Sequence, residues 1–289
     1  MATDASARGK APDFGQTESQ HAALAAFLAT DRSSLKRDVP SEFAQRQIVE
    51  LRCTACHSRD TKIDLWDDLI KEVEPLAKGD TVDPESNGAN PGAAGKGPLA
   101  GEAQPGTGDQ SRPPLTWTGE KLKPEWMATF IAGKLDYKPR AWMLARMPGF
   151  PARAEGLAVG LAMEHACPAK SPEEKAPDEA LATTGKQLVS RNGGFSCVQC
   201  HGIGNIAPIS PFEAPSINFK YTNERLRKEY YDRWMKDPTR IVPTTKMPKF
   251  QNDGKTALND ILEGDADKQF DAIWNYLQAG RKIQHPEQQ

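Results

Sequence analysis

Long apolar runs are missing from this chain of 289 residues, and its apolar content is modest throughout. Apolar residues make up 38% of the sequence, aromatic residues make up 7%, and the mean hydropathy is −0.64. A membrane-spanning helix requires roughly 18 or more consecutive apolar residues. The most apolar stretches, 22–29 and 157–163, are far shorter than that. The sequence therefore predicts no transmembrane segment.

The chain also lacks a surplus of basic residues and lacks clear strand patterns. Its 37 Lys and Arg residues face 39 Asp and Glu residues, for a formal net charge of −2. A protein that binds nucleic acid through a broad basic surface would need the opposite balance. No stretch alternates convincingly between apolar and polar residues, as a half-buried strand would. We expect no nucleic-acid partner and an all-α fold whose helices are joined by long loops.

Cysteine is scarce, and four of the five cysteines fall into two Cys-x-x-Cys pairs. The fifth, Cys167, has no obvious partner, and a single spare thiol does not predict a disulfide framework. We expect Cys167 to be a free or buried thiol, with a bridge to another molecule as the alternative. Of the histidines outside the pairs, we expect His285 to be solvated in a polar tail.

Each Cys-x-x-Cys pair is followed directly by a histidine, which makes two copies of one pentapeptide. This pentapeptide is the attachment signature of a c-type haem. Its thiols form thioethers to the porphyrin edge, and the neutral imidazole of its histidine binds the iron. The sequence therefore predicts two covalently bound haem c groups. The residues concerned are Cys53, Cys56 and His57 for the first haem, and Cys197, Cys200 and His201 for the second.

Two other chemistries also use Cys-x-x-Cys. Two such pairs can complete a four-thiolate zinc site, and a single pair can act as a redox dithiol. Neither use needs the trailing histidine in duplicate, and neither needs the Met-Pro pair that follows each motif downstream. Haem attachment is therefore the favoured interpretation.

The Met-Pro pairs supply the candidates for the opposite face of each iron. Met147 and Met247 both end the frame Arg, six residues, Met-Pro-x-Phe. A thioether is a soft, neutral ligand that favours ferrous iron, and the following proline keeps the methionine out of helical geometry. Met143, Met163 and His165 are the competitors for the first haem.

The motifs belong to a longer internal repeat. The segments 120–126 and 224–230 share a pattern of glutamate, basic, leucine, basic, and each is followed by the Arg-x6-Met-Pro-x-Phe frame. The arginines that open the two frames, Arg140 and Arg240, are candidates for pairing with haem carboxylates. His57 precedes Trp126 by 69 residues, whereas His201 precedes Tyr230 by only 29. The difference coincides with a Gly- and Pro-rich stretch in the first copy.

The repeat divides the chain. Residues 1–40 form a leader or the tail of a preceding domain, and residues 41–170 form a first domain with an inserted loop at about 74–113. Residues 177–282 form a second domain, and residues 283–289 form a C-terminal tail. The insertion leaves the first distal ligand less firmly assigned than the second.

Apolar spacing places helices around these landmarks. Spacings of three, four and seven residues predict helices at 44–51 and 181–188, each running into a cysteine motif. Asp265 can cap a helix at 265–277, and 157–161 is a weaker counterpart in the first copy. The segment 23–28 resembles this closing helix, as if it ended an earlier domain or were an amphipathic leader.

Each copy resembles a class I cytochrome c domain: a helix, Cys-x-x-Cys-His, long loops, Met-Pro in a loop and a closing helix. The resemblance implies two tandem cytochrome c-like domains, each wrapped around a covalent haem, with His57/Met147 and His201/Met247 as axial ligands. A looser similarity links the basic-Leu-basic and Met-Pro-x-Phe segments to cytochrome modules of planctomycete- and verrucomicrobia-type multidomain haem proteins. This similarity implies that the chain can be part of a longer protein.

A protein with both irons six-coordinate has no vacancy for a substrate. We therefore expect a dihaem electron carrier rather than an enzyme, passing single electrons from a redox enzyme such as a dehydrogenase to an acceptor. The alternative is a dihaem enzyme, peroxidase-like or thiosulfate dehydrogenase-like, with haem 1 as the catalytic site. A sensory or structural haem module in a larger assembly is a third option.

Haem attachment of this type takes place outside the bacterial cytoplasm, so we expect a periplasmic or otherwise exported protein. Residues 1–16 are small and polar and lack the basic start and apolar centre of a secretory signal. We therefore also expect that a leader has been removed or that the sequence is part of a longer chain.

Overall fold

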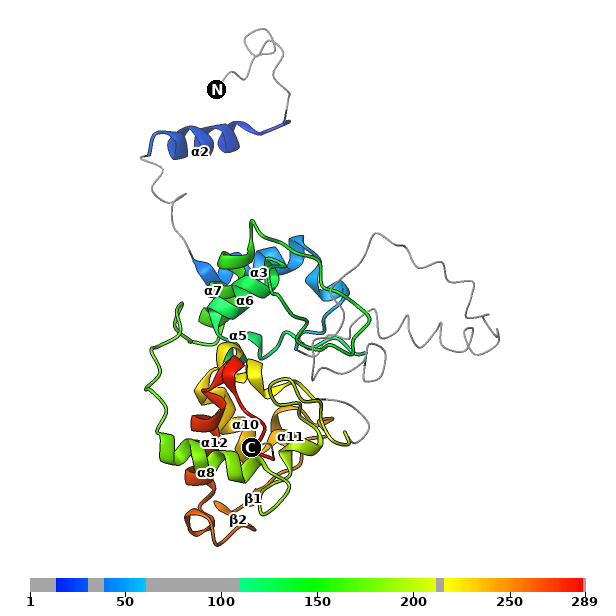
Figure 1. Cartoon of the computed structure of the whole chain (residues 1–289). Coiled ribbons are helices and arrows are strands. Elements are labelled where there is room, and N and C mark those ends of the chain that lie inside the picture. The colour runs from blue at the N-terminus through cyan, green and yellow to red at the C-terminus, as the bar shows by residue number, and fades with distance from the viewer. Residues whose placement is uncertain (1–13, 31–38, 61–109, 212–215, 288–289) are drawn as a thin grey trace, which may run out of the picture. The chain divides into compact units, whose positions relative to one another are not determined.

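The computed structural model describes residues 14–30, 39–60, 110–211 and 216–287, and it divides the chain into two compact units, Met1–Val39 and Pro40–Gln289 (Figure 1). The first unit contains helix α2 (Glu18–Leu28). Thr17 caps this helix in a capping box with Gln20. The predicted segment 23–28 lies within α2, and none of the helix's residues is buried. Its assignment to a preceding domain stays a prediction.

The second unit is mostly helical, which confirms the expected helical class. Its helices and short 3-10 turns (η) are, in chain order, α3 (Pro40–Glu50), η2 (Cys53–Ala55), α5 (Thr118–Lys121), α6 (Pro124–Ile131), α7 (Ala154–Glu164), α8 (Glu179–Val189), η3 (Cys197–Gln199), η4 (Phe219–Tyr221), α9 (Thr222–Arg225), α10 (Lys228–Lys236), α11 (Pro238–Ile241), η5 (Leu262–Gly264), α12 (Ala266–Leu277) and η6 (Gly280–Lys282). The four helices predicted at 44–51, 157–161, 181–188 and 265–277 correspond to α3, α7, α8 and α12. Asp265 caps α12 as expected, because its side chain accepts the Lys268 amide.

One small hairpin was not expected. Strands β1 (Gln251–Asn252) and β2 (Lys255–Thr256) pair antiparallel. The two residues between them, Asp253 and Gly254, have positive φ angles of 48° and 78°. An Asp-Gly pair is a recognised two-residue hairpin turn, so the local signal was present in the sequence.

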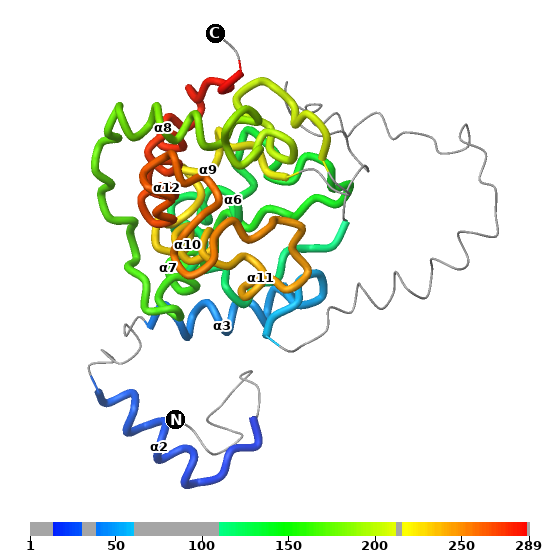
Figure 2. The backbone as a smooth tube through the Cα atoms, turned by 90° about the horizontal axis from the view of Figure 1, so that it is seen from below, coloured from blue at the N-terminus to red at the C-terminus, as the bar shows by residue number. Residues whose placement is uncertain are grey.

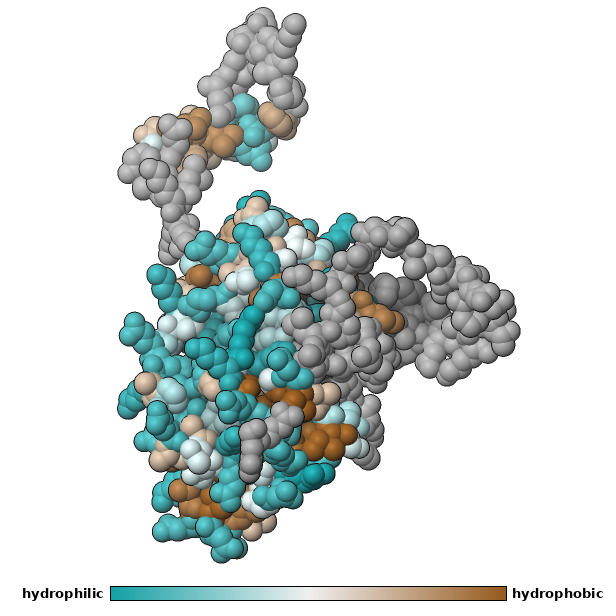
Figure 3. Space-filling view, viewed as in Figure 1, coloured by the Kyte–Doolittle hydropathy of each residue, from teal (hydrophilic) through white to brown (hydrophobic). Residues whose placement is uncertain are grey.

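Two apolar clusters form the interior of the second unit. In what we call the first lobe (described residues 40–60 and 110–168), helices α3, α6 and α7 enclose a cluster that includes Ile48, Met127 and Leu157. In the second lobe (177–211 and 216–287), α8, α10 and α12 enclose a cluster that includes Leu188 and Phe270. Figure 3 shows a mainly hydrophilic face over this unit, in keeping with the low apolar content. The domain boundaries predicted at 41–170 and 177–282 stay a prediction.

The opening and closing helices of each lobe cross at backbone contact. In the first lobe, Gly160 of α7 lies against the carbonyl of Pro40 at the start of α3. In the second lobe, Gly185 of α8 lies against the carbonyl of Ala272 in α12, and the two helices run side by side in Figure 2. A β-carbon at either glycine would overlap the facing backbone, so only glycine permits these crossings.

The two repeats pair with each other through their equivalent segments. Leu122 and Leu226, which occupy the same position in the repeat, form an antiparallel bridge. The Lys123 amide donates to the carbonyl of Arg225 (2.9 Å), and the Arg227 amide donates to the carbonyl of Lys121 (3.1 Å). Antiparallel pairing of equal positions relates the two segments by a local twofold axis.

Side chains from both lobes reinforce this pairing. The buried guanidinium of Arg227 donates to the carbonyls of Leu122 (3.2 Å) and Pro168 (3.1 Å). Arg281 forms a bidentate ion pair with Asp136 (2.6 and 2.8 Å), a geometry that adds specificity to the contact.

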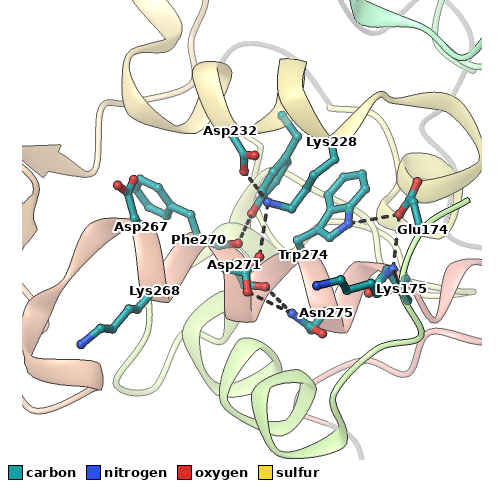
Figure 4. Close-up of polar contacts among 12 residues, drawn as sticks. Glu174, Lys175, Lys228, Asp232, Asp267, Lys268, Phe270, Asp271, Trp274 and Asn275 are labelled. Atoms are coloured by element: carbon teal, nitrogen blue, oxygen red, sulfur yellow. Dashed lines mark hydrogen bonds and ion pairs between the residues drawn. The ribbon is translucent and has the colours of Figure 1, made fainter. Parts of the chain in front are cut away.

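Residues 169–176 join the two lobes, and Glu174 in this segment contacts both of them. Glu174 accepts from the Trp274 indole of the second lobe (3.2 Å; Figure 4). It also accepts from the Lys123 ammonium of the first lobe (2.5 Å). Beside it, Lys228 pairs with Asp232 (2.6 Å) and Asp271 (3.3 Å).

Within the described part of the chain, no helix has the length and apolarity to cross a membrane.

The Gly185 crossing generates a test. Alanine at this position should lower the free energy of unfolding by about 2 kcal/mol, because its methyl group forces α8 away from the α12 backbone. Denaturant unfolding of Gly185→Ala measures the change, and Thr183→Ala on the exposed side of α8 is the matched control. A stabilisation of about 0.5–1 kcal/mol, as expected for an unhindered helix position, would contradict the close crossing.

Candidate functional site

The first cysteine motif follows the end of helix α3. The chain leaves α3 at Glu50 and passes through Arg52, whose φ is 53°. It then forms the turn η2, which contains Cys53. The turn ends with the His57 amide donating to the carbonyl of Cys53 (3.0 Å). The two cysteines and the histidine of the motif are thus held within one short turn.

The second motif repeats this geometry in the other lobe. The left-handed residue before the first cysteine is Ser196, whose φ is 61°. The turn η3 contains Cys197, and the His201 amide donates to the carbonyl of that cysteine (2.9 Å). Both repeats therefore use the same sequence of helix, left-handed residue and 3-10 turn.

The two motif histidines are oriented in the same way. Nδ1 of His57 lies 2.8 Å from the carbonyl oxygen of Pro113, and Nδ1 of His201 lies 2.8 Å from that of Ile217. A carbonyl oxygen only accepts, so Nδ1 donates its proton in each ring, and in the neutral form of such a ring Nε2 carries the lone pair. This is the arrangement that orients a histidine toward a metal through its other nitrogen.

Burial keeps the second histidine neutral. Burial lowers the pKa of His201 to about 4, because the loss of hydration outweighs the hydrogen bond to the Ile217 carbonyl, which acts to raise this pKa. The imidazole is therefore uncharged at neutral pH, as a metal ligand must be.

The first cysteine of each motif is a poor redox nucleophile as it stands. Burial raises the pKa of Cys197 to about 12, and it also raises the pKa of Cys53. A reactive dithiol requires the opposite shift, because the thiolate is the nucleophile. All five cysteines are unpaired within the chain.

The Met-Pro segments return to the same cores as the cysteine motifs. Met147 and Cys53 both pack against the cluster of the first lobe, and Met247 and Cys197 both pack against that of the second. Each predicted pair of distal ligand and attachment cysteine is thus brought to one apolar core. Sequence spacing alone could not establish this for the first lobe.

The competing methionines of the first lobe do not share this placement. Met143 is buried but lies outside the cluster that Cys53 contacts, and Met163 is 44% exposed on α7. Met127, which no sequence pattern singles out as a ligand, is buried in the cluster on the regular helix α6. Of the methionines in this cluster, Met147 is the one that lies in a loop and is followed directly by a proline.

One interaction distinguishes the two predicted distal ligands. The Trp234 indole donates to the sulfur of Met247 at 2.8 Å. The repeat places Phe130 at the corresponding position of the first lobe, where no N–H is available. Met247 therefore has a directed contact that Met147 lacks.

His165 and Cys167 lie to one side of this core. His165 caps α7 and lines a polar pocket of about 380 Å³ with Arg59 and Glu164, which form a 2.8 Å ion pair. A polar setting of this kind differs from the apolar cluster around Met147. Cys167 packs against that cluster, and its thiol donates weakly to the His165 carbonyl (3.6 Å).

His285 corrects one expectation, because it is buried rather than solvated. It is 7% exposed, and its Nδ1 accepts the Glu287 amide at 3.2 Å. The cause is the neighbouring Ile283, which packs into the cluster of the second lobe, while the Tyr276 hydroxyl donates to the carbonyl of Gln284 (2.5 Å). The described part of the tail therefore folds back onto the core.

The inserted loop predicted at 74–113 lies mostly outside the described residues. Its final residues are described, and they lie at the site. Pro113 provides the carbonyl that holds His57, and the Gln110 side chain donates to the carbonyl of Trp142 (3.2 Å) and accepts the Leu144 amide (2.7 Å). The chain that returns from the insertion thus helps to build the first site.

The arginines of the repeated frame are not equivalent. Arg140 is half-buried and donates to the carbonyl of Ser111 (3.1 Å), whereas the side chain of Arg240 is exposed and its amide is capped by Asp237. The carboxylate-binding role of the two arginines stays a prediction.

Two other cations, Lys121 and Arg225, lie deeper, and in the sequence they stand out only as members of the repeat. Arg225 is 8% exposed, and its guanidinium lies 5.7 Å from the ring centroid of Trp126. Lys121 is half-buried, with its ammonium 5.3 Å from the Tyr230 ring and 5.8 Å from the Trp234 ring. Their positions in the repeat are equivalent.

These cations are costly to bury. Burial, aided by the charges of Arg225 and Arg140, lowers the pKa of Lys121 to about 7, and burial lowers that of Arg225 to about 10. Removing an ion from water costs several kcal/mol, whereas a cation–π contact returns about 0.5–2 kcal/mol. The contacts to the rings therefore do not offset the burial by themselves.

The four motif cysteines do not form one zinc site. They belong to separate lobes, and among the described residues no three His, Cys, Asp or Glu side chains converge as metal ligands. A haem needs no such cluster, because the porphyrin provides four nitrogens of its own.

No protein-family model, curated protein or solved structure matches this chain.

The left-handed residue before each first cysteine generates a test. Valine at Ser196 should lower the free energy of unfolding by about 1–2 kcal/mol, because a β-branched residue is strained at positive φ. Glycine at the same position should be neutral or stabilising. Denaturant unfolding of both variants, with Thr183→Val as a surface control, measures the difference. Equal stability of the two Ser196 variants would count against the left-handed geometry.

Proposed function

We propose that this protein is a dihaem c-type cytochrome that transfers single electrons between a redox enzyme and an acceptor. Each lobe would be a cytochrome c-like domain around one covalently bound haem c. The observation that carries the proposal is the duplicated histidine geometry. In both lobes an Nδ1–H bond to a backbone carbonyl leaves Nε2 as the ring nitrogen that can face a metal, within the turn that holds both cysteines.

The residues present fit such a group. The thiols of Cys53, Cys56, Cys197 and Cys200 would attach the two haems, with His57 and Met147 as the axial ligands of the first and His201 and Met247 as those of the second. Cys53 and Met147 pack against one apolar cluster and Cys197 and Met247 pack against the other, which supports this assignment. The bound haem supplies the one-electron couple between Fe(III) and Fe(II).

The chain's own residues would orient and insulate that couple. The carbonyls of Pro113 and Ile217 fix the tautomer of each histidine and raise the basicity of its free nitrogen. The apolar clusters exclude water, and neutral thioether ligands favour the reduced state. With a histidine and a methionine both holding each iron, no position would be left for a substrate, and such a site would serve a carrier rather than an enzyme.

The surroundings of the protein follow from the same chemistry. Covalent haem attachment implies an exported location such as the periplasm, and a carrier implies two redox partners, a dehydrogenase-type donor and an acceptor. The chain could also serve as one part of a larger multidomain protein.

Ligand exchange tests the proposal on protein matured with covalent haem. Histidine in place of Met147 or Met247 should lower the reduction potential of one haem at a time, because histidine favours ferric iron relative to methionine. Redox titration followed by visible and near-infrared spectra measures both potentials. Met143→Leu and Met163→Leu are matched controls that should leave both haems unchanged.

The same spectra distinguish the alternative function. Two low-spin haems that bind no added ligand are expected for a carrier. A high-spin haem in the first lobe, or turnover of peroxide or thiosulfate, would replace the carrier by a dihaem enzyme with haem 1 as its catalytic site. Protein that matures without any covalent haem would reject both.

A further inference from the structure

Two buried cations cross from one lobe to the other. Arg225 ends helix α9 of the second lobe, and its guanidinium lies over Trp126, which is on α6 of the first lobe. Lys121 ends α5 of the first lobe, and its ammonium lies over Tyr230, which is on α10 of the second. The arrangement is reciprocal because Leu122 and Leu226 pair in an antiparallel bridge. This pairing brings the residue before each leucine, Lys121 or Arg225, close to the opposite lobe.

The acidic residues next to these cations are already engaged elsewhere. Glu120 pairs with Arg233, and Glu224 pairs with Arg281. Among the described residues, neither the Lys121 ammonium nor the Arg225 guanidinium forms a hydrogen bond or an ion pair with a side-chain carboxylate. Arg140 adds a further positive charge close enough to affect both. The described residues therefore gather positive charge at a partly buried interface and place no carboxylate against these two cations.

Each crossed cation adjoins the predicted haem site of the other lobe. Trp126, under Arg225, belongs to the cluster on which Cys53 and Met147 pack. The Trp234 ring, 5.8 Å from the Lys121 ammonium, donates through its indole to Met247. One aromatic ring thus separates Arg225 from the first core and Lys121 from the second distal ligand.

We propose that Arg225 and Lys121 bind haem carboxylates in a crossed arrangement, Arg225 those of the first haem and Lys121 those of the second. This inference rests on the proposed function and extends it, because it assigns the residues that neutralise the cofactor's acidic edge. A guanidinium matches a carboxylate in a two-pronged contact, and an ammonium matches it as a point charge. Each lobe thereby contributes a charge to the redox site of its neighbour.

The crossed arrangement has a measurable consequence. A positive charge near a haem favours Fe(II), which carries one positive charge fewer than Fe(III), so removal of the cation lowers the reduction potential. Arg225→Gln should therefore lower the potential of the first haem, although the residue belongs to the second lobe. Lys121→Gln should lower the potential of the second haem, although the residue belongs to the first.

The experiment uses the full chain with both haems attached. Haem content is measured first, and the two potentials are assigned by Met247→His, which displaces that of the second haem. Redox titrations then compare Arg225→Gln with Arg225→Lys, and Lys121→Gln with Lys121→Arg. The charge-conserving variants should keep the potentials closer to those of the parent protein. Lys134→Gln and Arg191→Gln remove exposed charges from the first and second lobes and should shift neither potential comparably.

The outcomes are distinct. A shift confined to the opposite lobe's haem supports the inference. A shift of the cation's own haem, no shift, or equal effects of the glutamine and charge-conserving variants overturns it while leaving the dihaem function intact. Protein without covalent haem would instead reject the proposed function. If Arg225→Gln does not fold, Lys121→Gln tests the reciprocal half independently, because Lys121 is only half-buried.

Discussion

The second unit depends on the pairing of two equivalent segments of its own repeat. Leu122 and Leu226 meet in an antiparallel bridge. Backbone hydrogen bonds on either side join Lys123 to Arg225 and Arg227 to Lys121. Backbone groups buried at an interface must find partners, and here each repeat satisfies those of the other. The same pairing places the basic side chains beside the neighbouring lobe.

A modest apolar content is compatible with two cores because each lobe uses close contacts where it can. Gly160 and Gly185 let the opening and closing helices approach at backbone distance. The remaining apolar surface gathers around the cysteine motif and the Met-Pro segment. Small domains bury a limited share of their own surface, so a large apolar cofactor at such a point would add substantially to the core. The proposed haems would therefore contribute to both function and stability.

Local signals predicted much of the fold. The spacing of apolar residues located α3, α7, α8 and α12, and the chemistry of Asp265 located the start of the last of these. The hairpin at Asp253 was missed although its turn sequence was typical, because its strands have only two residues each. His285 was misjudged because its burial depends on Ile283 docking into a core formed by distant helices.

The candidate ligands could be named from the sequence because each motif consists of a few neighbouring residues, Cys-x-x-Cys-His or Met-Pro, and each motif occurs twice in the chain. The two pentapeptides, the repeat and the helical class can be recognised from the order of residues alone. That Met147 rather than Met143 shares a core with Cys53, and that Pro113 holds His57, follows from the packing of the folded chain. The same packing makes Lys121 and Arg225 cross between lobes. These contacts join residues far apart in the chain, and their geometry depends on how whole helices pack, which no local pattern encodes.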